Sequence, residues 1–174
     1  MSDTLKIAII GDYNFTYNAH HATNLSLDHS SEFLELEPNY YWVKTIDALK
    51  HKASYFEQYD GVWIAPGPIE NPFYLKGIFK KIIENKIPVL ITGEGFKLFL
   101  EYLINFHQLT SYQEKLISEN LVAGNSFERL EIQPKSKAFK KIYENFSKIE
   151  LTSSRYSIYP QLADQLKDNF IDVE

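Results

Sequence analysis

The sequence predicts an α/β fold with a mostly parallel central sheet that is covered by helices on both faces. Two observations lead to this prediction. Short apolar runs such as Leu5–Ile10 (LKIAII) are typical of strands that are buried on both faces. These runs alternate along the chain with longer segments whose apolar residues recur at helical spacing, and this alternation indicates a parallel sheet.

The first 65 residues contain three of the expected strands. After the strand 5–10, the segment from Ala19 to about Leu36 has helical spacing, although it is largely polar. Tyr40–Ile46 (YYWVKTI) is rich in aromatic and β-branched residues, which favour a second strand. Asp60–Ala65 (DGVWIA) is the third, because Pro66-Gly67-Pro68 ends it.

A helix, a strand and a further helix complete this pattern. Pro72–Asn85 has apolar residues at helical spacing, Pro88–Ile91 is a fourth strand, and Phe96–Phe106 is again helical. Ligands of parallel sheets bind beyond the carboxyl ends of the strands. Three loops are therefore expected to meet at one edge of the sheet: 11–18, 65–72 and 92–95.

The last third of the chain has weaker patterns, and most of its expected elements are short. The sequence predicts, in order, a helix at 110–117, a turn at 123–127, a strand at 129–133, a helix at 134–146, one strand within 149–159 and a helix at 160–166.

Composition narrows the class of protein. The 174 residues suit one domain, and the absence of cysteine excludes disulfides, thiolate metal sites and a cysteine nucleophile. A net charge of -5 argues against a nucleic-acid partner, and no segment has the roughly 20 apolar residues of a membrane span. The histidines lack metal-ligand spacing, and no G-x-G-x-x-G motif is present. We expect a cytoplasmic protein without metal or cofactor.

The stretch Pro88–Lys97 (PVLITGEGFK) is the most informative part of the sequence. A short strand runs directly into a glycine-rich turn that opens a helix, which is the frame that presents a nucleophile in many α/β enzymes. This turn contains Thr92, Gly93 and Glu94, but neither cysteine nor serine. The frame of an active site is therefore present without its usual reactive atom.

Several segments resemble a known family when they are read in order. The segments KIAIIGDY, YDGVWIAPG, IENKIPVLITGEGF and FLEYLINF resemble the class I glutamine amidotransferase domain of CTP synthase, and more closely small free-standing CTP-synthase-like proteins. A weaker likeness continues through AGNSFERLEIQPKSKA and SSRYSIYPQLADQL. The resemblance implies a flavodoxin-like three-layer sandwich formed by a single amidotransferase-like domain, 1–174, that ends before the family's last strands.

The resemblance also implies that the family's nucleophile is missing. The cysteine position falls on Gly93, Gly95 matches the glycine that follows it, and Lys97 replaces a glutamine. An alternative register, counted back from the helix, places Thr92 at the nucleophile position instead. Glycine has no nucleophile, and a threonine without an adjacent base is only weakly nucleophilic. Glutamine hydrolysis is therefore not expected.

The catalytic base is missing as well, whereas parts of a ligand site are retained. Tyr159-Pro160-Gln161 has the outline of the family's His-Pro-Glu motif, but a phenol of pKa about 10 is no base at neutral pH. We favour instead a match of this segment to an earlier Asn-Pro helix start of the family. Pro66 and Gly67 resemble the loop whose backbone amides form the oxyanion hole, and Glu101 resembles the glutamate that holds the substrate's amino group. A tight turn and a solvated helix residue are the alternative interpretations.

Two further side chains are candidates for the site. Glu94 is either a nucleophile or general base, or a carboxylate that accepts backbone amides at the helix start, and we favour the second role. His20 or His21 reaches the site from the first loop if the resemblance extends that far. The simpler interpretation places both at a solvated helix start.

Two classes of function follow from these residues. The first is a catalytically silent amidotransferase-like domain that binds a small polar ligand, glutamine-like or nucleotide-like, or a synthetase-type protein partner. The second is a hydrolase or transferase of altered chemistry that uses Glu94 with His20, His21 or Glu101. A homodimer is compatible with both classes.

Overall fold

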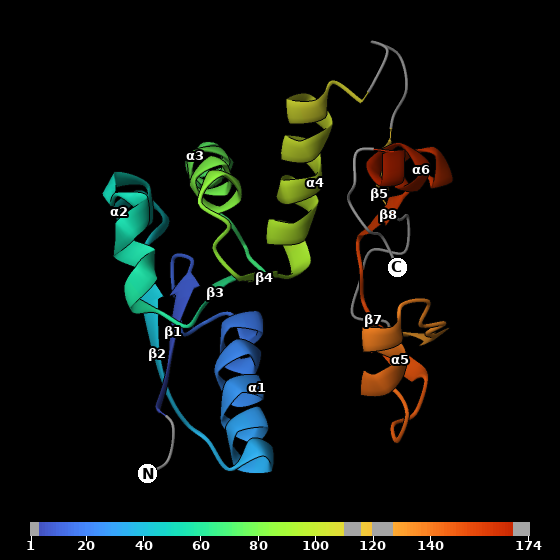
Figure 1. The fold of residues 1–174 in the computed structure, drawn as a ribbon, viewed down its shortest axis with the longest axis horizontal. Helices are drawn as coiled ribbons and strands as arrows, with labels where there is room; N and C mark the ends of the chain where they lie inside the picture. Colours follow the sequence, from blue (N-terminus) through green and yellow to red (C-terminus); the bar gives the residue numbers. More distant parts are fainter. Residues whose placement is uncertain (1–3, 110–115, 120–126, 169–174) are drawn as a thin grey trace. The chain divides into compact units, whose positions relative to one another are not determined.

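The computed structural model describes residues 4–109, 116–119 and 127–168. Its contacts divide the chain into two compact units, Met1–Leu103 and Ile104–Glu174. The boundary falls within the long helix α4 (Gly93–His107). Figure 1 shows the order of the elements along the chain.

The first unit is built on a four-stranded parallel sheet with the strand order β2-β1-β3-β4. The strands are β1 (Thr4–Ile10), β2 (Glu37–Val43), β3 (Gly61–Ile64) and β4 (Val89–Ile91). Ile10 at the end of β1 pairs with Val43 and with Ile64, so these three strands end at one level. After β1 the chain adds β2 on one side of this strand and then β3 and β4 on its other side. Ligands of doubly wound sheets bind at the point where the strand order reverses in this way.

Helices cover both faces of this sheet (Figure 1). They are α1 (Asn18–Leu34), α2 (Thr45–Lys50), the 3₁₀ helix η1 (Ala53–Gln58), α3 (Pro72–Glu84) and α4. The core combines one face of β1 and β3 with α2, η1, α3 and α4, and includes Ala8, Ile10, Val62, Ile64, Ala48, Phe56, Leu75, Ile78, Phe79, Ile82 and Leu98. On the opposite face, Trp42 of β2 donates from Nε1 to Oδ1 of Asn24 in α1 at 2.9 Å.

Local sequence explains why α3 forms where it does. Asn71 precedes the helix, its Oδ1 accepts the N–H of Phe73 at 3.2 Å, and Pro72 occupies the first turn. The apolar residues then recur every three or four positions, so one stripe of the helix faces the sheet. The buried members of the stripe are Leu75, Ile78, Phe79 and Ile82.

The second unit contains two small antiparallel sheets. The strand β5 (Ile117–Glu119) pairs with β8 (Tyr156–Ile158), and β6 (Glu128–Glu131) pairs with β7 (Ile149–Thr152). Two helices complete the described part, α5 (Lys137–Ile142) and α6 (Pro160–Asp168). The Ser136 hydroxyl caps α5 by accepting the N–H of Phe139 at 3.1 Å.

The predicted fold class is confirmed, and the first unit differs from prediction mainly at element ends. The second strand was expected to reach Ile46, but β2 ends at Val43 and α2 begins at Thr45. Asp12 stabilises this helix start by accepting the N–H of Thr45, a contact between distant residues that no local pattern reveals. The last helix of the unit was expected from Phe96 and instead begins at Gly93, within the turn itself.

Predictions for the second unit were less accurate. A helix was expected at 110–117, but Ile117 belongs to β5, and 110–115 lie outside the described residues. The predicted turn at 123–127 also lies outside them, apart from Phe127. One strand was expected within 149–159, whereas two are present with different partners. The helix expected at 134–146 is shorter and corresponds to α5. The strand expected at 129–133 corresponds to β6. The helix expected at 160–166 corresponds to α6.

Candidate functional site

The turn between β4 and α4 has a backbone shape that only glycine adopts readily. Gly93 has a φ angle of +56°, and the helix begins at this residue. The Thr92 hydroxyl, the other candidate nucleophile, accepts the indole N–H of Trp63 at 2.9 Å. It is therefore already used in a contact between the turn and β3.

The loop after β3 faces this turn and also contains a glycine with positive φ. Gly67 is buried and has a φ angle of +100°. The backbone N–H of Glu94 donates to the carbonyl oxygen of Pro66 at 2.7 Å. Oε2 of Glu94 accepts the backbone N–H of Ile69 at 3.0 Å. One residue of the turn thus makes two hydrogen bonds to the loop, and we call residues 66–69 together with Gly93 and Glu94 the closed turn.

The closed turn leaves no space for a side chain at either glycine. An ideal Cβ atom on Gly93 would lie 2.5 Å from the carbonyl oxygen of Pro66 and 2.7 Å from its Cβ. A Cβ atom on Gly67 would lie 2.7 Å from Oε2 of Glu94. A Cβ atom on Gly95 would lie 2.9 Å from the carbonyl oxygen of Ala65, so this glycine allows α4 to pack closely on β3.

Glu94 accepts a backbone amide, but this amide belongs to the neighbouring loop, whereas the sequence predicted an amide at the start of its own helix. The carboxylate is partly buried and Ile69 is buried. Because a buried amide without an acceptor is costly, the carboxylate of Glu94 stabilises the loop conformation.

Glu101 lies two turns further along α4 and has a cationic partner. Nζ of Lys97 is 2.8 Å from Oε1 of Glu101, which is an i,i+4 pair on the helix surface. The side chains are 24% and 38% exposed, so solvent screens the pair only in part. Lys97 and Glu101, two residues singled out by the sequence comparison, are thus paired with each other.

His20 is a buried polar residue that contacts both Asn14 in the first loop and the backbone of Gly67 in the closed turn. Its side chain is only 1% exposed and lies against the rings of Tyr13, Tyr17 and Trp42, with centroid distances of 5.8, 5.4 and 4.9 Å. Nδ1 accepts the N–H of Asn14 at 3.0 Å, so the neutral imidazole carries its proton on Nε2.

The environment of His20 favours this neutral form. Burial lowers the pKa of the imidazole, and the backbone of Asn14 and Gly67 and the carboxylate of Asp12 oppose that shift without cancelling it. The simpler interpretation of a solvated helix start is therefore wrong for His20. It holds for His21, which is exposed and whose Nε2 lies 2.7 Å from the carbonyl oxygen of Phe15.

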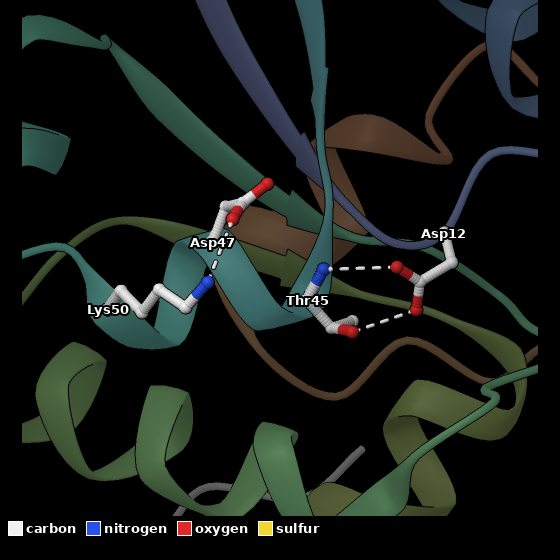
Figure 2. A network of polar contacts seen from close by, with 4 residues as sticks. All are labelled: Asp12, Thr45, Asp47 and Lys50. Carbon is white, nitrogen blue, oxygen red and sulfur yellow. Dashed lines mark hydrogen bonds and ion pairs between the residues drawn. The ribbon is translucent and has the colours of Figure 1, made fainter.

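A pocket with a volume of about 420 Å³ lies beyond the carboxyl ends of β1 and β2. Residues 12–14, residues 44–46 and three residues at the start of α3, Glu70, Asn71 and Tyr74, form its walls. Oδ2 of Asp12 accepts the hydroxyl of Thr45 at 2.8 Å, and Oδ1 accepts its N–H at 3.3 Å (Figure 2). We call this cavity the open pocket.

The structure thus brings some of the predicted site residues together and leaves others apart. Pro66, Gly67, Gly93 and Glu94 form one contact group, and His20 reaches the backbone of Gly67. Thr92 is bonded to Trp63, and Glu101 to Lys97. The open pocket was not predicted as a site, although two of the loops that line it, 11–18 and 65–72, were expected to meet at this edge of the sheet.

Other kinds of site find no support in the described ranges. No group of three or more histidine, aspartate or glutamate side chains there has the arrangement of a metal site. No helix among these residues combines the length and the apolar character that crossing a bilayer requires.

Comparison with known proteins identifies the class of fold. The chain has the flavodoxin-like fold of class I glutamine amidotransferases, with a parallel central sheet between layers of helices. It is similar to the solved glutaminase domain of Trypanosoma brucei CTP synthase with bound acivicin, with a TM-score of 0.68 and 16% identity. The likeness covers 94% of this chain and 72% of that one. No family model and no curated protein matches the sequence.

Proposed function

We propose that this protein is an amidotransferase-like domain that does not hydrolyse glutamine and acts by binding a small polar ligand or a protein partner. The closed turn is the observation that carries the proposal. At Gly93 there is neither a nucleophile nor the space for one, since a Cβ atom would lie 2.5 Å from the carbonyl oxygen of Pro66. A cysteine placed here would first have to open the turn.

The hydrogen bonds of Glu94 support the same conclusion. In amidotransferases that this chain resembles, backbone amides of the Pro-Gly loop stabilise the oxyanion that forms on the substrate. Here the amide of Ile69, in that loop, donates to a carboxylate of the protein itself. A substrate oxyanion would have to compete with an anion that is already in place.

The surroundings of His20 add a third argument. Glutamine hydrolysis needs a base that takes a proton from the nucleophile. Nδ1 of His20 accepts the amide of Asn14, and the ring is enclosed by aromatic side chains. The imidazole holds two loops in place in the neutral state and is not presented to a bound substrate.

A glutaminase assay tests the proposal directly. Glutamate release from millimolar glutamine is measured for the purified chain, for Gly93→Cys and for an active amidotransferase as the positive control. We expect no release above background from the first two, because the variant lacks both the space and the base. Turnover by the unaltered chain that disappears in Glu101→Ala would overturn the proposal.

The same preparation separates this proposal from altered chemistry at Glu94. A screen of amide, ester and glycoside substrates with the unaltered chain is followed by Glu94→Gln. We expect no activity in the screen, because the Glu94 carboxylate is bonded to the Ile69 amide. If the screen finds an activity and Glu94→Gln abolishes it, the protein is an enzyme that uses this carboxylate, and the proposal of a silent site is wrong.

A further inference from the structure

We infer that the open pocket binds a small zwitterion, namely a free α-amino acid, which bears both a carboxylate and an ammonium group. The pocket is separate from the closed turn. The inference therefore stands whether or not the chain hydrolyses glutamine. The volume of about 420 Å³ lies within the range of about 300 to 1,000 Å³ that is typical of ligand sites.

The position of the open pocket favours a ligand site. It lies beyond the carboxyl end of β1, which is the strand next to which the order of the sheet reverses. Loops after two different strands and the start of a helix converge there, as in doubly wound sheets that bind ligands. Asp12 joins two of these loops through its bonds to Thr45, so the walls are held in place before a ligand arrives.

The charges of the walls favour a zwitterion over a phosphate. Lys44 supplies one positive charge, whereas Asp12 and Glu70 supply two negative charges. The nearby Lys50 is paired with Asp47 at 3.6 Å outside the pocket walls, and so it adds no free cation (Figure 2). A nucleotide or another polyanion would meet a net negative surface. A ligand with one charge of each sign would find a partner for both.

The hydrogen-bonding groups of the pocket walls also favour a zwitterionic ligand. Oδ1 of Asn14 accepts the N–H and the hydroxyl of Thr16, and Oδ1 of Asn71 accepts the N–H of Phe73. Both amides thus present their NH₂ groups as donors. With the ammonium of Lys44 these groups suit a carboxylate.

The opposite charge of the ligand also has partners. The carboxylate of Glu70 suits an ammonium group, and aromatic rings attract cations as well. Tyr13, which is 42% exposed, and Tyr74 supply rings in the same walls. These rings can also contact the apolar part of an amino acid.

Titration of the ¹⁵N-labelled full chain with L-glutamine, L-leucine and L-phenylalanine, each up to 10 mM, tests the inference by NMR. We expect at least one of them to shift the backbone amides of residues 12–14, 44–46 and 70–74. The N-acetyl and amide derivatives of that amino acid should each bind at least about tenfold more weakly, because each lacks one charge. Shifts confined to residues 66–69 and 92–97 would overturn the inference, and so would no shifts at all.

Matched substitutions add a second measure. Lys44→Met and Glu70→Gln change exposed side chains of the pocket, and each should weaken binding about tenfold. Lys52→Met and Glu57→Gln change exposed side chains outside its walls and should leave binding unaltered. An equal loss of affinity in the pocket variants and in the control variants would contradict a zwitterion site. Tighter binding of inorganic phosphate or UTP than of any amino acid at this pocket would contradict it as well.

Discussion

The closed turn and the open pocket occupy the same edge of one sheet, yet they use their polar groups in opposite ways. In the closed turn, the amide of Ile69 and the carbonyl of Pro66 are both bonded to Glu94. In the open pocket, Asp12 and Asn14 bond to neighbouring backbone and hydroxyl groups, and the residues that line the cavity include Lys44, Glu70 and Asn71. The difference teaches that two neighbouring loop clusters of one sheet can be built differently, one closed by hydrogen bonds between its own residues and one arranged around a cavity.

Substitution of Gly93 should have the largest effect on stability. We expect Gly93→Ala to lower the free energy of unfolding by about 2 to 4 kcal/mol, because Ala disfavours a φ of +56° and its Cβ would collide with Pro66. Urea denaturation followed by circular dichroism measures the change.

Gly61→Ala is the matched control, since a Cβ atom there meets nothing within 4 Å. It should alter the free energy of unfolding by no more than about 0.5 kcal/mol. If the two variants unfold at the same urea concentration, the turn is not closed in the way described, and Gly93 has room for a nucleophile after all.

Removal of the Glu94 carboxylate should have the next largest effect. Glu94→Ala leaves the buried amide of Ile69 without an acceptor, and we expect a loss of about 1 to 3 kcal/mol in the free energy of unfolding. Glu94→Gln keeps an oxygen within reach and should cost less than half as much. Thermal or urea unfolding of both variants provides the measurement.

Glu84→Ala serves as the control for Glu94, because Glu84 is 56% exposed and pairs with Lys80 on the surface of α3. The expected change is at most about 0.5 kcal/mol. A Glu94→Ala variant as stable as this control would mean that the carboxylate is available for chemistry.

Substitution of Asp12 probes the walls of the open pocket. Asp12→Asn keeps one acceptor for Thr45 and loses the charge, so we expect a loss of about 1 kcal/mol in the free energy of unfolding. Asp47→Asn removes the exposed partner of Lys50 in the same region and should change it by less than about 0.5 kcal/mol (Figure 2). A reversed order would show that the surface pair, and not Asp12, supports the helix start at Thr45.

The sequence predicts the parts of the fold that depend on neighbouring residues. The apolar run of β1 and the helical spacing of α3 are local patterns, and both elements were predicted within a residue or two. The start of α2 depends on Asp12, which is 33 residues away, and the strand β5 depends on its pairing with β8. Such contacts leave no periodic pattern, and this explains why α2 and β5 were missed.

In the candidate site too, the sequence predicts the features that depend on neighbouring residues and misses those that depend on distant contacts. The glycine-rich turn was evident from the spacing of Pro88–Lys97, because a strand, two glycines and a helix follow one another directly. The contact between Glu94 and Ile69 spans 25 residues and joins two loops, and it became evident only in the folded chain. The burial of His20 depends on the ring of Trp42 in a different element, so its sequence neighbours indicated an exposed position.

His20 lies between the two regions compared above, and its titration gives the smallest predicted effect. Its pKa in the folded state is lowered below the ordinary value of about 6.5, chiefly by burial. Below about pH 6.5 the unfolded chain therefore binds a proton that the folded chain resists, so stability falls as the pH drops toward the folded pKa and is fully present above pH 6.5.

The prediction is tested by the free energy of unfolding between pH 5 and pH 7.5 for the unaltered chain and for His20→Gln. The variant should be less stable at pH 7.5 and should show a shallower loss of stability on acidification, because glutamine does not titrate in this range. The slope measured for the unaltered chain is the reference for this comparison. If His20→Gln keeps that slope instead, the imidazole is accessible to protons in the folded state, and its contact with the backbone of Gly67 is open to solvent.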